Sequence, residues 1–204
     1  MNKPLVMLLA GGGGTRLGVL VSHRSKPAVP FAGSYRIIDF ALSNVMQAGL
    51  DWVGGLTQYK PLSLMSHIGS GKPWNFHGRR RGVRILPPRT GTAASDWYRG
   101  TADAIWQSMD FMEPLRPERV LILSGDHIYH MDYRKMLEDH LDAGADVTLA
   151  VMEVEARDTR RFGMVHADEA GWVKRFEEKP QTTDSRLASM GIYLFEWPCL
   201  REAL

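Results

Sequence analysis

Apolar runs of strand length alternate along this chain with segments of helical periodicity, and this alternation restricts the fold more than any other feature. The strand-like runs cover residues 5–9, 52–57, 119–124 and 147–154. The segments of helical spacing cover residues 37–46, 61–68, 101–112 and 132–144. Alternation of this kind is typical of a layered α/β domain with a largely parallel sheet.

The last third of the chain has a different pattern. Residues 164–166 and 172–176 flank Asp168–Gly171, which is a turn sequence, and together they predict a β-hairpin. Residues 189–195 predict one more strand. We therefore expect antiparallel strands to extend the parallel sheet.

Two segments depart from regular structure. Residues 69–95 contain Gly, Pro and five arginines, and only Val83–Leu86 resembles a strand, so we expect a long mobile loop near the functional site. Pro198 suits the first turn of a final helix, yet the chain stops at Leu204, about two turns later. We interpret this ending as a fragment of a longer protein or a truncated reading frame.

Composition limits the classes of partner. Lys and Arg total 25 against 23 Asp and Glu, and a net charge of +2 gives no general attraction to nucleic acid or an anionic membrane. Cys199 is the only cysteine in the sequence, which suggests a reducing compartment. No apolar stretch approaches the roughly 20 residues of a membrane-spanning helix. We expect a soluble, cytoplasmic protein without nucleic-acid or membrane partners.

A run of four glycines, Gly11–Gly14, directly follows the first strand and precedes Thr15 and Arg16. Backbone without side chains lets several N–H groups approach phosphate oxygens, and Arg16 and Lys26 supply positive charge nearby. The spacing fits neither the dinucleotide fingerprint nor the Walker A loop. The run therefore predicts a phosphate-binding loop of another type, with a flexible turn as the alternative.

Asp126 follows the buried strand 119–124. Open parallel sheets bind ligands at the carboxyl ends of their strands. If this strand neighbours the first one, Asp126 faces the glycine loop, where a carboxylate opposite a phosphate is a natural magnesium ligand. The alternative is an Asp that caps a helix or forms a turn.

Three other features have simpler explanations. His127 and His130 lack a cysteine or a third ligand, which disfavours zinc. The run Arg79–Arg81 has no interleaved aromatic residues, so a solvated loop is favoured over an RNA-binding patch. From its local sequence alone, Lys179 between acids and a proline is compatible with an exposed ion pair.

Nine segments spread over nearly the whole chain form a series: G-G-G-G-T-R-L, S-K-P-A-V-P-F, R-I-I-D-F-A-L-S-N, L-T-Q-Y, W-Y-R-G-T-A-D-A, S-G-D-H-I-Y, F-G-M-V, F-E-E-K-P and S-M-G-I-Y-L-F. In this order they resemble the ADP-glucose pyrophosphorylase (glucose-1-phosphate adenylyltransferase) family. The resemblance implies a Rossmann-like nucleotidyltransferase fold, with a mostly parallel mixed sheet and helices on both faces. A C-terminal left-handed β-helix follows in the family.

By the same resemblance, residues 1–204 are the N-terminal portion of the catalytic domain. The β-helix domain and the later part of the catalytic domain, with its second metal-binding Asp, are missing. The implied reaction converts ATP and glucose 1-phosphate to ADP-glucose and pyrophosphate, for bacterial glycogen or plant starch. Magnesium is the implied cofactor, and a homotetramer is the implied full-length assembly.

The resemblance also assigns roles to individual residues. The nucleotide would be held by Gly11, Gly12, Gly13, Gly14, Thr15 and Gly100. Arg16 and Lys26 would neutralise the triphosphate, and Asp126 would hold magnesium. The positions matching the glucose 1-phosphate site are Tyr98, Gly163, Glu178, Lys179 and Ser189, and this reverses the interpretation of Lys179 given above.

Regulation is implied less directly. Gln58 and Trp97 match positions that link regulatory and substrate sites in bacterial members. Sugar-phosphate activators or AMP often bind basic residues matched here by His23, Arg24 and Arg36. His23 and Pro30 replace the Lys and His of one enterobacterial pattern, so the effector is left open.

Gly13 stands where many family members carry Arg, which predicts a poorer apparent affinity for ATP.

Two rival functions remain. A uridylyl- or thymidylyltransferase usually has P-x-G-L-A where this chain has residues 98–102, and that difference favours adenine. A non-catalytic subunit or fragment that binds a sugar nucleotide would agree with the missing C-terminal half.

Overall fold

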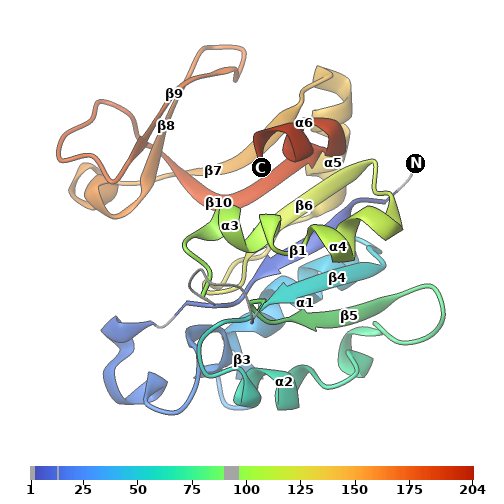
Figure 1. Ribbon diagram of the computed structural model, residues 1–204. Helices are drawn as coiled ribbons and strands as arrows, with labels where there is room; N and C mark the ends of the chain where they lie inside the picture. The colour runs from blue at the N-terminus through green and yellow to red at the C-terminus, as the bar shows by residue number, and fades with distance from the viewer. Residues whose placement is uncertain (1–2, 13, 90–96) are drawn as a thin grey trace.

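The computed structural model describes residues 3–12, 14–89 and 97–204, and most strands in these ranges form one mixed sheet (Figure 1). The strand order is β5-β4-β1-β6-β10-β8-β9, and β7 pairs with β10. The parallel strands are β1 (Leu5–Leu9), β4 (Trp52–Leu56), β5 (Gly82–Leu86) and β6 (Arg119–Ser124). The predicted α/β architecture is confirmed.

The sequence predicts the antiparallel orientation of residues 164–176 and 189–195, but not that of residues 147–153. Antiparallel strands extend the sheet. These are β7 (Val147–Glu153), β8 (Gly163–Ala167), β9 (Val173–Glu178) and β10 (Leu187–Glu196). Strand β10 pairs with β6 at one end and with β8 at the other, so it connects the parallel strands to the β8–β9 hairpin, which extends away from them (Figure 1). A two-stranded sheet of β2 (Pro30–Phe31) and β3 (Tyr35–Arg36) lies apart.

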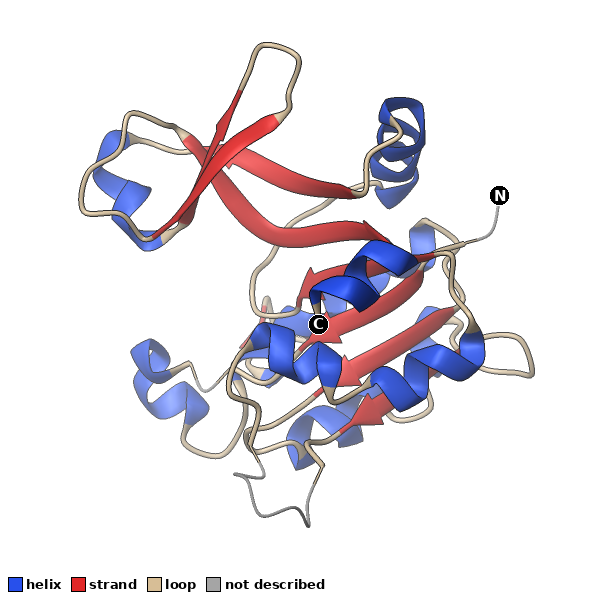
Figure 2. Ribbon diagram, turned by 45° about the horizontal axis from the view of Figure 1, so that its top comes forward, coloured by secondary structure: helices blue, strands red, loops and turns tan. Residues whose placement is uncertain are grey.

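Helices cover both faces of the parallel strands (Figure 2). Alternate residues of a strand point to opposite faces, so Val6 and Leu8 join one buried cluster while Leu5 and Met7 join another. The first cluster includes side chains of α1 (Ile37–Gln47), α2 (Leu62–Ile68) and α5 (Tyr133–Ala143). The second includes side chains of α3 (Thr101–Trp106), α4 (Met109–Met112) and α6 (Trp197–Ala203).

The predicted helix ends are confirmed where cap residues mark them. Asp132 accepts a hydrogen bond from the backbone N–H of Arg134 at 3.0 Å and begins α5. Gly144 ends α5 and Gly49 follows α1, both with positive φ (58° and 70°). A left-handed residue at these positions is the usual helix terminator, and glycine adopts it without steric cost.

Two expectations about irregular and helical segments need correction. The single helix predicted over residues 101–112 is divided into α3 and α4, because the Ser108 hydroxyl donates to the carbonyl of Ala104 at 2.9 Å, a bond that bends helices. The segment 69–95 is not loop throughout. Trp74 and Phe76 are buried in the core and anchor part of this segment to it. Residues 90–96 lie outside the described ranges.

Within the described ranges, every helix is too short or too polar to cross a lipid bilayer.

The close packing of α4 on the sheet depends on Gly54, and this generates a stability prediction. A Cβ atom at Gly54 would lie 2.8 Å from the Phe111 ring and 2.9 Å from Met7 Sδ, whereas one at the adjacent Gly55 would meet only the Ile85 methyl at 3.1 Å among close contacts. We expect Gly54→Ala to lower the free energy of unfolding by about 1–3 kcal/mol through overpacking. Gly55→Ala is the matched control on the opposite face. Equal denaturation midpoints for both variants would contradict this account.

Candidate active site

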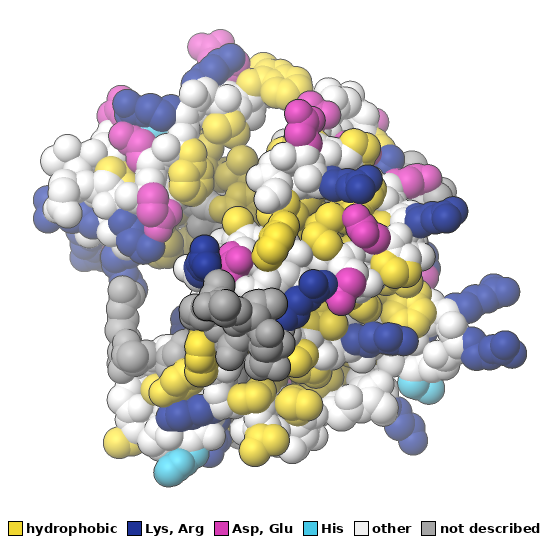
Figure 3. Space-filling view, viewed as in Figure 1, with side chains coloured by type: hydrophobic (Ala, Val, Ile, Leu, Met, Phe, Trp, Pro, Cys, Tyr) yellow, Lys and Arg dark blue, Asp and Glu magenta, His cyan; other side chains and the backbone are white. Residues whose placement is uncertain are grey.

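A cleft of about 540 Å³ lies where the carboxyl end of β6 meets strands β8, β9 and β10. In the space-filling view the surface is hollowed between the β8–β9 hairpin and the rest of the molecule (Figure 3). Six residues assigned to substrate or metal from the sequence are found on its wall: Lys26, Asp126, Gly163, Glu178, Lys179 and Ser189. These residues come from segments up to 163 positions apart, and the fold brings them together.

The position of Asp126 follows from strand order. Strand β6 pairs with β1 in parallel, with Ser124 opposite Leu9, and the backbone N–H of Gly125 donates to the Leu9 carbonyl at 2.9 Å. A Cβ atom on Gly125 would lie 2.8 Å from the Ile38 side chain, so glycine permits this close approach. Asp126 Oδ2 lies 4.0 Å from where a Gly12 Cβ would be. The predicted placement of Asp126 opposite the glycine loop is confirmed.

The glycine loop is held against Lys26. The backbone N–H of Lys26 donates to the Gly12 carbonyl at 3.2 Å. Gly14 has φ +61°, and a Cβ atom there would lie 2.7 Å from Lys26 Cβ, so a larger residue would be strained as well as crowded. Gly13 lies outside the described residues, as do the side chains of Thr15 and Arg16. Their assigned roles stay predictions.

The Asp126 carboxylate has three polar neighbours on the cleft wall or beside it. Its Oδ2 accepts a hydrogen bond from Lys26 Nζ at 3.0 Å, and its Oδ1 accepts one from the Ser124 hydroxyl at 2.7 Å. His127 Nδ1 lies 3.4 Å from the same Oδ1. The contact with His127, followed by the bonds from Ser124 and Lys26, holds the pKa of Asp126 well below its usual range despite partial burial. The carboxylate is therefore ionised at neutral pH and available to a cation.

The opposite wall of the cleft is built from the β8–β9 hairpin and β10. Gly163 pairs with Glu178 across the hairpin, and a Cβ atom on Gly163 would collide with the Phe176 ring. Glu178 forms an ion pair with Lys179, which is exposed and has a positive φ of 45°. Ser189 Oγ lies 3.1 Å from the Tyr193 hydroxyl. This wall presents a carboxylate, an ammonium group and hydroxyls, which suit a sugar phosphate.

Tyr98 and Gly100 do not line the cleft. The Tyr98 hydroxyl donates to the Leu86 carbonyl at 3.1 Å, and burial raises the pKa of Tyr98 to about 12. Gln58 donates to the Tyr98 carbonyl at 3.4 Å and accepts from its N–H at 3.1 Å, and it also lies against Gly11. Gln58 thus connects the glycine loop to the segment that carries Trp97, whose side chain is half exposed.

Several residues of the cleft wall were not identified from the sequence. They include His127, Arg161, Phe176 and Tyr193. The sequence pattern indicates His127 only as a candidate zinc ligand, whereas the structure places it beside Asp126. A signal was present, because each residue lies within two positions of an assigned site residue or on the same strand as one.

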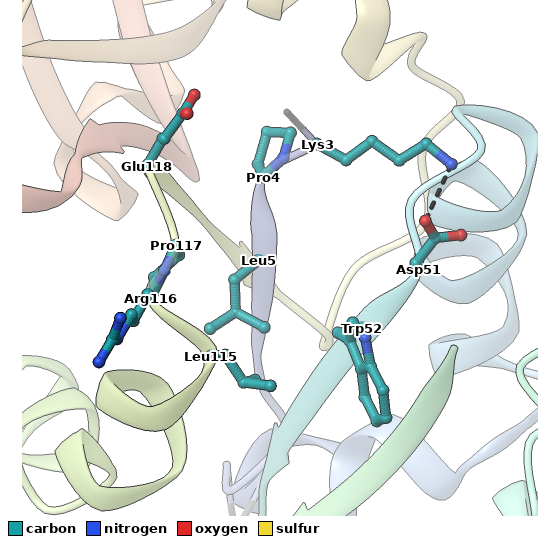
Figure 4. A pocket seen from close by; sticks show the side chains of 9 residues that line it. All are labelled: Lys3, Pro4, Leu5, Asp51, Trp52, Leu115, Arg116, Pro117 and Glu118. Carbon is teal, nitrogen blue, oxygen red and sulfur yellow. Dashed lines mark hydrogen bonds and ion pairs between the residues drawn. The ribbon is translucent and has the colours of Figure 1, made fainter. Parts of the chain in front are cut away.

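A second cavity, of about 480 Å³, opens at the opposite edge of the sheet, at the amino ends of β1 and β4 (Figure 4). Its wall carries Lys3 and Arg116 together with Asp51 and Glu118, and Lys3 Nζ contacts Asp51 Oδ2 at 2.9 Å. The opposite charges on this wall balance, so it offers no net attraction to phosphate. The cleft at Asp126 is the stronger candidate, because ligands of parallel sheets bind at the carboxyl edge.

The depressed pKa of Asp126 predicts its response to acid. An unperturbed Asp titrates near pH 3.9, so ionised Asp126 contributes stability above that value, and the contribution is lost as the pH falls through the lower pKa of the folded state. We expect a carboxyl ¹³C NMR titration to give Asp126 a midpoint below that of an ordinary Asp. Ser124→Ala should move it upward, and a midpoint at or above the ordinary value would contradict this electrostatic account.

Comparison with known proteins agrees with this geometry. Residues 5–204 match the model of the nucleotidyl transferase family. Glucose-1-phosphate adenylyltransferases of Lachnospira eligens, Halalkalibacterium halodurans and Clostridium acetobutylicum are 54%, 53% and 52% identical to the chain, over 100%, 100% and 98% of it. The chain spans about half of each relative's length, namely 48%, 54% and 53%. Because the family model covers nearly every residue, the chain belongs to the nucleotidyl transferase family.

Proposed function

We propose that the protein containing this chain transfers the adenylyl group of ATP to glucose 1-phosphate, giving ADP-glucose and pyrophosphate. The observation that carries the proposal is the single cleft in which Lys26 and Asp126 face Glu178, Lys179 and Ser189. The names of the relatives reported above support it, and so does the family model.

The reaction suits a site without a protein nucleophile. The phosphate of the sugar is largely a dianion at neutral pH, since its second pKa is about 6. One of its oxygens forms a bond to the α-phosphorus of ATP while the bond from that phosphorus to the β-phosphate oxygen breaks, and pyrophosphate leaves. The protein has to position two polyanions and neutralise their charge. Lys26 serves the nucleotide phosphates, and Lys179 serves the sugar phosphate.

The donor set at Asp126 fits magnesium. Mg²⁺ takes oxygen ligands and is commonly held by one or two carboxylates together with substrate phosphates and water. Asp126 is ionised, partly exposed and on the cleft wall, and Lys26 is its cationic partner in the structure. No cluster of three or more acidic, His or Cys side chains within the described ranges could hold a metal ion without a substrate. Magnesium, when bound, would neutralise phosphate charge.

The finer assignments belong to the same proposal. ADP-glucose would serve glycogen synthesis in a cytoplasmic enzyme, and the lone Cys199 is compatible with that compartment. The contacts of Gln58 with Gly11 and with Tyr98 support a link from the glycine loop to the Trp97 segment. Control by a small-molecule effector and a homotetrameric assembly of the longer protein complete the proposal.

Calorimetric titration of the 204-residue chain with ADP-glucose and UDP-glucose, in the presence of magnesium, tests the proposed substrate. We expect saturable binding with a preference for ADP-glucose. Asp126→Asn should weaken this binding only when magnesium is present, and Asp51→Asn, in the cavity at the opposite edge, is the matched control. A preference for UDP-glucose would instead support a uridylyltransferase. Binding by the folded chain without turnover by the longer protein would support a non-catalytic subunit.

Gly13 generates a further prediction for the longer protein. A guanidinium at this position would add charge-assisted hydrogen bonds to the triphosphate, and each is worth about 1.5–3 kcal/mol. Gly13→Arg should therefore lower the KM for ATP about tenfold or more and leave the KM for glucose 1-phosphate unchanged. A higher KM for ATP in steady-state kinetics would contradict the prediction.

A further inference from the structure

The charges on the cleft wall are paired unevenly. Among its described residues, three cations (Lys26, Arg161 and Lys179) face two carboxylates (Asp126 and Glu178). Lys26 is paired with Asp126, and Lys179 is paired with Glu178. The carboxylate partner of Arg161 is Asp158, at 3.1 Å, which is not part of the wall. Arg161 therefore gives the cleft a positive charge that no carboxylate of the wall cancels.

The backbone places Arg161 next to Lys179. Arg161 is the last residue of the short 3₁₀ helix Ala156–Arg161, and Phe162 connects it to Gly163 at the start of β8. The backbone N–H of Lys179 donates to the Phe162 carbonyl at 3.1 Å. Two cationic side chains thus leave neighbouring ends of β8 and β9, and both line the same cleft.

The ion pair that now engages Arg161 is easily exchanged. The side chain of Arg161 is 63% exposed and that of Asp158 is 35% exposed. Exposed ion pairs of this kind contribute little to stability. A phosphate dianion can accept two parallel hydrogen bonds from one guanidinium. With Lys179 also contributing positive charge, such a phosphate competes successfully with the exposed Asp158 carboxylate for Arg161.

We propose that Arg161 binds the phosphate of the sugar phosphate together with Lys179. The assignment rests on the proposed function, because it deepens the description of the same substrate site. Arg161 and Lys179 form a clamp at the end of the cleft built by β8 and β9, whereas Lys26 and Asp126 form the end beside the glycine loop. A sugar phosphate held by this clamp lies in the same cleft as Lys26 and Asp126.

The test is calorimetric titration of the full 204-residue chain with glucose 1-phosphate and, separately, with ATP. Arg161→Gln should weaken glucose 1-phosphate binding about tenfold, the loss expected for one charge-assisted contact, and leave ATP binding unchanged. Arg161→Lys should recover part of the loss. Arg157→Gln is the matched control, because Arg157 lies in the same 3₁₀ helix, pairs with Glu155 and approaches Asp158, but is not on the cleft wall.

The outcomes distinguish failure of the Arg161 assignment from failure of the proposed function. Equal affinity of Arg161→Gln and the unaltered chain for glucose 1-phosphate would overturn the role of Arg161 and leave the proposed function standing. A loss confined to ATP, or an equal loss in Arg157→Gln, would also overturn it. Failure of the unaltered, folded chain to bind glucose 1-phosphate would overturn both, and thermal melting of every variant establishes that it is folded.

Discussion

The parallel pairing of β6 with β1 is the constraint on which the candidate site depends. It brings Gly125 within hydrogen-bond distance of the Leu9 carbonyl, so the residue after each strand emerges at the same edge of the sheet. The glycine loop follows β1 at this edge, and Asp126 follows β6 at the same edge. The ion pair between Lys26 and Asp126 then closes the contact over a sequence separation of 100 residues. A different strand order would separate the glycine loop from the Asp126 carboxylate.

The antiparallel extension supplies the second half of the site. Strand β10 continues past β6 to pair with β8, and the chain adopts a positive φ at Gly191, between the two regions of its pairing with β7. This arrangement holds Ser189 and the β8–β9 hairpin opposite Asp126. The cleft is therefore formed by two parts of one sheet. Its charged residues are divided in the same way: Lys26 and Asp126 lie at the end beside the parallel strands, and Glu178 and Lys179 lie at the end formed by the hairpin.

Much of this organisation could be predicted from the sequence. Strand periodicity and helix caps are local signals, so the positions of β1, β6, α5 and the hairpin followed from short segments. The division at Ser108 was missed because one hydroxyl bond to Ala104 outweighs an otherwise helical pattern. The packing of Trp74 was missed because burial of an isolated aromatic residue depends on distant partners.

Some residues of the site could be predicted from the sequence and others could not, because some depend on local signals and others on distant partners. Asp126 was identified because a carboxylate after a buried strand has a definite place in a parallel sheet. Lys179 was ambiguous in its local sequence, and only the resemblance to a family gave it a role. Arg161 lies two positions before the assigned Gly163, but its local sequence does not show which carboxylates share the cleft wall with it. Charge balance within a cavity is a property of the folded chain.

The central claim is that the cleft between Asp126 and the β8–β9 hairpin, and not the cavity at the opposite edge, binds the sugar nucleotide. Two-dimensional ¹H–¹⁵N NMR of the folded chain during titration with ADP-glucose and magnesium tests it most directly. We predict that backbone signals of Lys26, Asp126 and Lys179 shift together with one dissociation constant, while those of Lys3 and Trp52 stay in place. Saturable shifts confined to Lys3 and Trp52 would contradict the account.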